Sequence, residues 1–238
     1  MGWSIYIDAL TEGIELLASG AVDVWVIIEA SMAVSGTAAL IALGAGVPLG
    51  VLLGIRRFAG RRFGLLIANT GMGLPPVAVG LIVAMGLSRR GPFGGLSMLY
   101  TRDAMVVAQV LIALPLVVAF TAASVAAVPR QLRLQARSLG ASRFHEVLLV
   151  VREARMGVAA AVAAGFGAII SEVGAVQMVG GNIAGDTRVM TTAIVQYTRM
   201  GRYGQALSLA LMLLGMIAIV NAVLVIGQTS AERYEGHR

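Results

Sequence analysis

Long apolar runs, separated by short stretches rich in arginine, glycine and proline, recur along the whole chain. A helix needs about 20 predominantly apolar residues to cross the hydrocarbon core of a bilayer. Five runs meet this requirement, and they cover residues 24–54, 63–87, 104–128, 156–181 and 204–227. The pattern therefore predicts an all-α integral membrane protein with about five transmembrane helices surrounded by lipid bilayer.

The segments outside these runs are short. Residues 1–23 carry four acidic residues and no basic one, and their apolar positions, such as Leu10 and Ile14, predict a short amphipathic helix on the outer membrane surface. This segment lacks a basic n-region, so we do not expect a cleaved signal peptide. Residues 24–227 form the transmembrane domain, and residues 228–238 form a cytoplasmic tail.

Composition excludes several kinds of chemistry. The chain is 58% hydrophobic and 13% charged, whereas soluble domains have about 25% charged residues. It contains no lysine and no cysteine, which excludes a Walker A loop, a Schiff base and a thiolate site. The two histidines, His145 and His237, lie too far apart in sequence to suggest a metal site. We therefore expect no cofactor, no metal and no ATP hydrolysis on this chain.

The arginines predict an orientation. With the N-terminus outside, the inner segments 55–62, 129–155 and 228–238 hold 12 arginines, and the outer segments hold 6. Cytoplasmic loops carry an excess of basic residues, so the N-terminus is expected outside and the C-terminus in the cytoplasm. The same rule accounts for the net charge of +6 without a nucleic-acid partner.

Small residues and prolines lie inside the apolar runs. Gly46, Gly50 and Gly54 recur every four residues, which lets another helix approach closely, and Gly157, Gly165, Gly167 and Gly174 are expected to do the same in the fourth run. Pro48, Pro75, Pro76 and Pro115 free backbone carbonyls that neighbours or a wet cavity must satisfy. Together with Asn69 and Thr70, these prolines indicate either a moving, cavity-lining helix or simple kinks in a static bundle.

The longest inner loop spans residues 128–155. Pro129 ends the third run, residues 131–139 predict a short helix, and Gly140 can end that helix in a left-handed conformation. Ser142 can then cap a second helix. Leu134, Leu139 and Phe144 are candidate apolar anchors for a cytosolic partner. The alternative is an ordinary basic loop lying on anionic lipid headgroups.

The run LQARSLGASRFHEVLL resembles the EAA loop of ABC-importer permeases, whose coupling helix docks into a groove on the ATPase subunit. The resemblance places the docking surface at Ala136, Leu139, Gly140, Ala141, Ser142, Arg143 and Phe144. The match is partial. Leu134 and Gln135 stand where the common pattern has Glu and Ala, and Arg152 and Glu153 replace the usual Leu-Pro.

Three further stretches, residues 73–94, 152–155 and 171–194, look like the permease of tungstate-type ABC importers. The resemblance implies a type I importer (MetI-like) fold in the cell (inner) membrane. It also implies a homodimer with two cytosolic ATPase subunits and an extracytoplasmic solute-binding protein. It implies tungstate as cargo, with molybdate and sulfate as alternatives. A secondary transporter is a rival, but it needs intramembrane ionisable residues, and the runs offer little beyond Glu29 and Glu172. A membrane enzyme is a further alternative, but the sequence offers no nucleophile–base pair for it.

Residues 171–194 contain the candidate gate. Glu172 lies deep in the fourth run, with Arg188 as its candidate partner, and it either pins the turn as a buried ion pair or gates the exit of the pathway. The glycine-rich turn that follows is expected to offer neutral donors to a passing oxyanion, or simply to close the outer gate. The candidate gate residues are Glu172, Gly180, Gly181, Asn182, Thr187, Arg188, Thr191 and Thr192. Outside, Arg89 and Arg90 could attract an anion or dock the binding protein through its acidic residues, and docking is favoured.

Overall fold

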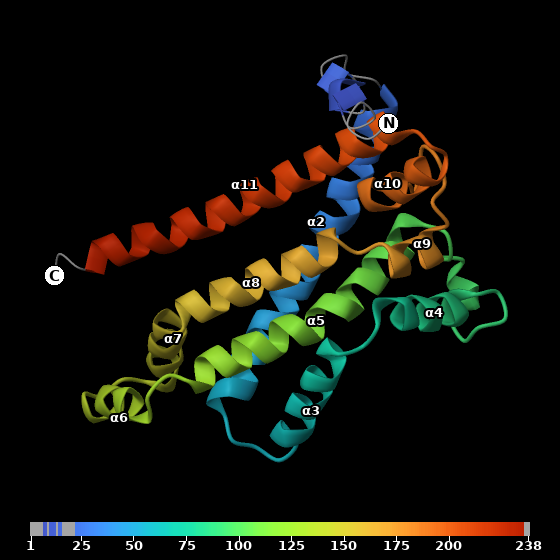
Figure 1. Ribbon diagram of the computed structural model, residues 1–238. Coiled ribbons are helices and arrows are strands. Elements are labelled where there is room, and N and C mark those ends of the chain that lie inside the picture. Colours follow the sequence, from blue (N-terminus) through green and yellow to red (C-terminus); the bar gives the residue numbers. More distant parts are fainter. Residues whose placement is uncertain (1–6, 9, 13, 16–21, 236–238) are drawn as a thin grey trace. The chain divides into compact units, whose positions relative to one another are not determined.

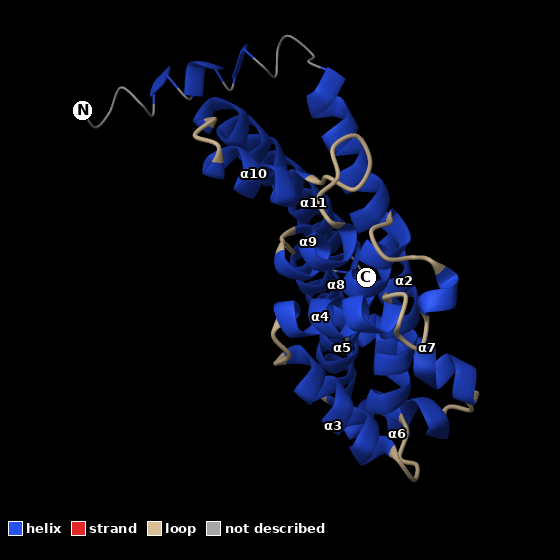
Figure 2. Cartoon of the chain, turned by 90° about the vertical axis from the view of Figure 1, so that its right-hand side faces the viewer, coloured by secondary structure: helices blue, strands red, loops and turns tan. Residues whose placement is uncertain are grey.

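The computed structural model describes residues 7–8, 10–12, 14–15 and 22–235 (Figure 1). Most of the amphipathic helix expected over residues 1–23 therefore lies outside the described residues. Within the described part, the regular structure is helical and contains no strand, as the cartoon in Figure 2 shows. The helices are α2 (Val22–Ile55), α3 (Arg61–Met72), α4 (Pro76–Leu87), η1 (Gly94–Leu96), α5 (Arg102–Ala126), α6 (Arg130–Ser138), α7 (Arg143–Glu153), α8 (Arg155–Ile170), α9 (Gly174–Gly180), α10 (Met190–Arg199) and α11 (Tyr203–Glu235).

Three helices are individually long and apolar enough to cross a membrane. They are α2, α5 and α11, which correspond to the first, third and fifth predicted spans. α11 continues to Glu235, past the end expected at residue 227. Two further spans are obtained only when the pairs α3 with α4 and α8 with α9 are each counted as one interrupted span. The expected number of five is thus reached, but only three of the spans are continuous.

The spans expected over residues 63–87 and 156–181 are each broken into two helices. The first is interrupted at Pro75 and Pro76, where Pro75 has extended backbone (φ −62°, ψ 125°) and Pro76 begins α4. Proline has no N–H and disfavours helix in the residue before it, so consecutive prolines suit a helix start better than a helix interior. The second is interrupted between Ile170 and Gly174. The short helix α10 was not expected at all.

The described chain divides into two compact units. Unit 1 comprises the described residues up to Ala38, together with Pro75–Gln109 and Ile169–Ala222, and unit 2 comprises the rest. The helices α2, α5 and α11 are each divided between the two units.

Unit 2 is organised by close contact between α2 and α5. A Cβ atom added at Gly46, Gly50 or Gly54 would lie 2.8 Å from Val117 Cγ1, 2.5 Å from Thr121 Cβ or 2.7 Å from Val125 Cγ1 respectively. Real Cβ atoms do not approach that closely, so the prediction that the glycine stripe admits a neighbouring helix is confirmed. Gly157 and Gly165 also lie against α5, whereas a Cβ at Gly167 would meet nothing within 4 Å.

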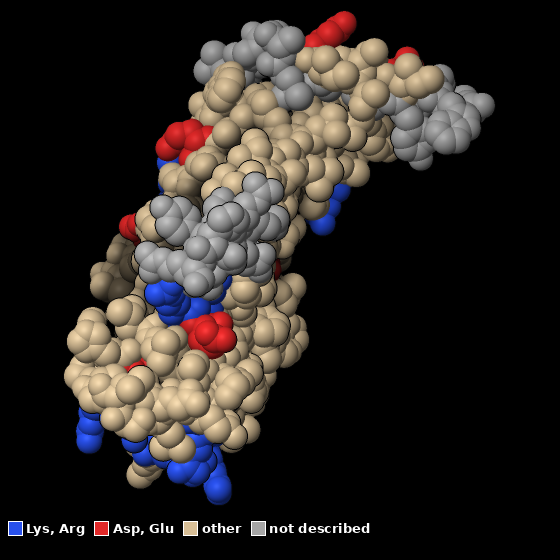
Figure 3. Space-filling model, turned by 90° about the vertical axis from the view of Figure 1, so that its left-hand side faces the viewer, with Lys and Arg blue, Asp and Glu red and all other residues tan. Residues whose placement is uncertain are grey.

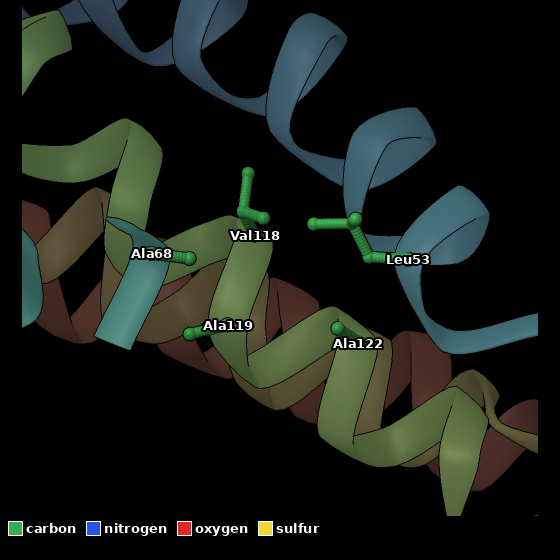
Figure 4. Packing of buried hydrophobic residues seen from close by; sticks show 5 residues of the cluster. All are labelled: Leu53, Ala68, Val118, Ala119 and Ala122. Atoms are coloured by element: carbon green, nitrogen blue, oxygen red, sulfur yellow. The ribbon is translucent and has the colours of Figure 1, made fainter. Parts of the chain in front are cut away.

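Apolar residues fill the space next to this contact. Leu53 of α2 points toward Val118 and Ala122 of α5, and Ala68 of α3 completes the cluster (Figure 4). Nearer the loop that follows α5, Val125 packs with Val150 and Ala154 of the α7 end. The C-terminal ends of α2, α5 and α7 are therefore packed together within unit 2.

Unit 1 has two packing centres. α4 and α9 lie against each other, and a Cβ at Gly80 would come within 2.5 Å of Ala175 Cα. Elsewhere Ile27 of α2, Met190 and Ala193 of α10, and Leu209 of α11 form a buried cluster. Ser31 Oγ accepts a 2.7 Å hydrogen bond from the Met190 backbone N–H, which fixes the start of α10 against α2.

Candidate functional site

The loop between α5 and α8 folds as two short helices with a sharp corner. α6 covers Arg130–Ser138 and α7 covers Arg143–Glu153, in agreement with the predicted helix over residues 131–139 and the cap that follows. At the corner Gly140 has φ +83°, the left-handed conformation expected of it. The Ala141 N–H donates to the Ala136 carbonyl at 3.0 Å, which closes the end of α6.

Ser142 caps α7 as predicted. Its Oγ accepts a hydrogen bond from the His145 backbone N–H at 3.4 Å, and it lies 2.7 Å from His145 Nδ1. A side-chain acceptor at this position satisfies a backbone donor that has no partner within the helix. The corner is thus a defined turn and not a flexible linker.

Large apolar side chains project from this corner. Leu139 is 87% exposed and Phe144 is 73% exposed, and Leu134 on α6 is 50% exposed. Apolar side chains presented together on a rigid turn are typical of an interaction surface. The candidate coupling residues Ala136, Leu139, Gly140, Ala141, Ser142, Arg143 and Phe144 are therefore contiguous at one corner of unit 2.

A buried carboxylate fastens α6 to α7. Glu146 is only 4% exposed, and its two oxygens accept hydrogen bonds from Arg133 Nε and Arg137 Nε, each at 2.8 Å. Arg133 also donates to the Ile55 carbonyl at the end of α2, at 3.4 Å. The hydrogen bond from Arg137 first, and then that from Arg133, lowers the pKa of Glu146 against the opposing effect of burial.

This clamp, formed by Arg133, Arg137 and Glu146, was missed in the sequence. The sequence analysis gave Glu146 no role, whereas two arginines on the preceding helix bind its carboxylate. The spacing of Arg133 and Arg137, four residues apart on a helix, was an available signal because such residues share a helix face. The sequence did not indicate that Gly140 folds that face back onto α7.

The second candidate site, in unit 1, lies around Glu172. This residue is 8% exposed, and its Oε1 accepts a 2.8 Å hydrogen bond from the Ala175 backbone N–H at the start of α9. Glu172 therefore caps the second half of the interrupted span. A carboxylate at a helix N-terminus is also favoured by the helix dipole.

The expected ion pair between Glu172 and Arg188 is wrong. None of the ion pairs among the described residues joins them. Arg188 instead donates to Asn182, from Nε to Oδ1 at 3.3 Å and from Nη2 to the carbonyl at 3.4 Å. The backbone of the glycine-rich turn bends back through positive φ angles at Gly181, Asn182 and Gly185. Arg188 therefore bonds Asn182 within the same turn.

The threonines near this turn are bonded to backbone atoms. Thr187 Oγ1 donates to the Gly180 carbonyl at 2.5 Å and accepts from the Ile183 N–H at 3.0 Å. Thr191 Oγ1 donates to the Glu172 carbonyl at 2.9 Å, and Thr192 Oγ1 donates to the Val189 carbonyl at 3.1 Å. In this structure the three hydroxyls stabilise the turn instead of offering their protons to a passing anion.

Two further polar residues, missed in the sequence, hold unit 1 together. Gln109 is buried and donates through Nε2 to the Ile169 carbonyl at 3.1 Å and to Ser35 Oγ at 3.4 Å. Arg102 bonds Glu29 Oε1 at 3.0 Å and the Asp186 carbonyl at 3.0 Å. Both join segments that are distant in sequence, so no local pattern could reveal them. Arg89 and Arg90 are exposed in the turn after α4.

Comparison with known proteins gives three findings. A family model described as "Binding-protein-dependent transport system inner membrane component" matches residues 46–233. The chain is 41% identical to the tungstate uptake system permease protein TupB of Peptoclostridium acidaminophilum, over 91% of this chain and 95% of that protein. It is 40% identical to a probable anion ABC transporter permease protein of Haloferax volcanii, over 81% of this chain and 85% of that protein.

A solved structure is similar as well. It is described as showing inward-facing conformations of the MetNI methionine ABC transporter, and it matches with a TM-score of 0.61 at 20% sequence identity. The match covers 93% of this chain and 95% of that chain. At this identity the likeness concerns the fold.

Proposed function

The chain belongs to the family of binding-protein-dependent transport system inner membrane components, and from this premise we propose that it is the permease subunit of an ATP-driven tungstate importer. It is an ABC-importer permease with a MetI-like fold, and it is a transporter subunit, not an enzyme. The expected fold class is thereby confirmed. Tungstate is proposed as cargo because the relative at 41% identity over most of both chains is a tungstate uptake permease.

The observation that carries the proposed mechanism is the corner at Gly140. It presents Leu139 and Phe144 to solvent while the Glu146 clamp fixes its direction relative to α2. A rigid lever of this kind can receive force from a partner and pass it to the end of a membrane helix. We propose that two cytosolic ATPase subunits dock here, one on each copy of a homodimer, because homo-oligomers usually assemble with closed symmetry.

The orientation and the outer partner complete the proposal. The excess of arginines in the inner segments favours an N-terminus outside and a C-terminus in the cytoplasm. This orientation places the corner at Gly140, here called the docking corner, on the cytoplasmic side. A solute-binding protein delivers the oxyanion on the outer side, with Arg89 and Arg90 meeting its acidic residues. The turn over residues 180–192, which follows the helix capped by Glu172, is the proposed outer gate. Its bonded hydroxyls support closure instead of cargo binding in this conformation.

Transport by the reconstituted complex tests this function. Proteoliposomes containing the chain, its ATPase and its binding protein are expected to accumulate tungstate only when ATP is supplied on the ATPase side. Uptake that persists without the ATPase and follows a proton gradient would replace the proposal with a secondary transporter. Parallel assays with molybdate and sulfate, together with thermal-shift titration of the binding protein with each anion, decide which oxyanion is the cargo.

A further inference from the structure

A cavity of about 750 Å³ lies in unit 2 next to the clamp. Its wall is formed by the end of α2, the loop to α3, the end of α5 and the helices α6 and α7. Seven arginines line it against one carboxylate, that of Glu146. Figure 3 shows basic side chains gathered at the end of the molecule where α3 and α6 lie in Figure 1. The cavity is therefore strongly positive.

Three of the seven arginines have acceptors inside the protein. Arg133 and Arg137 bond Glu146, and Arg61 Nε donates to the Leu53 carbonyl at 2.7 Å. The other four are Arg56, Arg57, Arg130 and Arg143. Among the described residues, these four make no ion pair with an acidic side chain. Like charges gathered in one cavity repel each other, so a bound anion would stabilise this arrangement.

The cavity adjoins the ends of helices that are long and apolar enough to cross a membrane. Two membrane-crossing helices end beside it, α2 at Ile55 and α5 at Ala126. Phe58 in its wall is 45% exposed, and α3, which begins at the wall residue Arg61, carries the exposed apolar residues Phe63 and Leu66. A charged recess beside exposed apolar side chains matches an amphiphile with an anionic head and hydrocarbon tails.

We propose that this cavity binds the phosphate headgroup of an anionic phospholipid. Guanidinium groups pair with phosphate oxygens through two parallel hydrogen bonds, and basic pockets between membrane helices on the cytoplasmic side suit such headgroups. The size supports a lipid over a small free anion, because one tetrahedral oxyanion fills only a small part of the cavity. A lipid bound here would contact Arg133 and thereby the clamp that orients the docking corner, an effect that goes beyond the transport function itself.

Lipid retention by the full-length protein tests the proposal. The chain is reconstituted in phosphatidylcholine nanodiscs containing a minor fraction of cardiolipin, re-extracted in mild detergent, and analysed by native mass spectrometry for bound lipid. Each arginine near the membrane surface contributes roughly a factor of five to anionic-lipid binding, so the Arg57→Gln/Arg130→Gln variant should retain cardiolipin about thirtyfold more weakly. The Arg89→Gln/Arg90→Gln variant, altered outside the cavity, should retain it as the wild type does.

Additional variants and a competition assay separate the possible outcomes. The Arg57→Lys/Arg130→Lys variant keeps the charge and should recover most of the binding, which shows that charge is responsible. If the double glutamine variant loses its helical circular dichroism, each single variant, with an expected loss of about fivefold, decides the question. Equal cardiolipin retention by wild type and cavity variants overturns the proposal. Competition by inorganic phosphate without any preference for cardiolipin over phosphatidylcholine also overturns it, because the ligand is then a soluble anion.

Discussion

Glu146 on α7 receives a 2.8 Å hydrogen bond from Arg133 on α6, across the left-handed corner at Gly140. Because Arg133 also reaches the carbonyl of Ile55, this one buried carboxylate connects the docking corner to the end of a membrane-crossing helix. The relationship gives the corner a fixed direction. It also identifies the residues whose change should loosen the corner without altering its apolar surface.

Replacing Glu146 by glutamine should loosen α6 from α7. The glutamine side chain is neutral and has one acceptor oxygen, so it cannot replace both hydrogen bonds from the two arginines. We expect a loss of about 1–3 kcal/mol of local stability, moderated because the Arg137 side chain is 56% exposed. Hydrogen exchange over residues 130–146 measures the loss. Glu153→Gln, at an exposed position of the same helix, is the control, and identical exchange in the two variants would show that the clamp does not hold the corner.

Acid should release the same clamp. The pKa of Glu146 is lower in the folded protein than in the unfolded chain, so its contribution is fully present above the unfolded value of about 4.3 and is lost as pH falls through the folded value. The difference in amide protection between wild type and Glu146→Gln should therefore disappear on acidification. A difference that is constant across this pH range would assign the protection to packing instead of charge.

The corner itself depends on Gly140. Its φ of +83° is unfavourable for a β-branched residue, so Gly140→Val should cost about 1–2 kcal/mol and reduce co-purification of the ATPase subunit. Gly140→Asn is the matched variant, because asparagine adopts this conformation more readily. Nothing lies within 4 Å of the added Cβ in the isolated chain, so a clash inside this chain does not explain a loss. Undiminished ATPase yield with both variants would remove the corner from the docking surface.

Close packing of α4 on α9 should make Gly80 sensitive to even one methyl group. An added Cβ would lie 2.5 Å from Ala175 Cα, so Gly80→Ala should destabilise unit 1 by about 1–3 kcal/mol. Gly86→Ala on the same helix meets only Phe93 Cδ2 at an ordinary 3.6 Å and serves as the control. Thermal unfolding in detergent compares the two, and equal midpoints would contradict the close contact.

The cap at Glu172 predicts a local effect at the proposed outer gate. Glu172→Ala removes the acceptor of the Ala175 N–H and should cost about 0.5–2 kcal/mol at the start of α9. We expect higher basal ATPase activity in the assembled transporter with little change in tungstate affinity of the binding protein. Glu172→Gln retains an acceptor oxygen and should stay close to wild type. If the alanine variant matches wild type in basal activity and uptake, Glu172 has no gating role.

The sequence by itself determined the elements that depend on local pattern. Apolar runs defined the membrane helices, and Gly140 and Ser142 defined the corner, because helix ends follow from backbone geometry and capping within a few residues. The glycine spacing on α2 predicted a close neighbour. Pro75 and Pro76 indicated an irregularity in the second run, but the break at residues 171–173 was not anticipated, because an apolar run of sufficient length does not show whether its helix is continuous.

Only the tertiary structure decided which polar groups meet. Glu172 was assigned to Arg188, yet it caps α9 while Arg188 closes its own turn on Asn182. Glu146 carried no strong signal, yet two arginines from the preceding helix enclose it. A hydrogen bond depends on distances of a few tenths of an ångström between segments that the fold brings together, and hydrophobic periodicity carries no information at that scale.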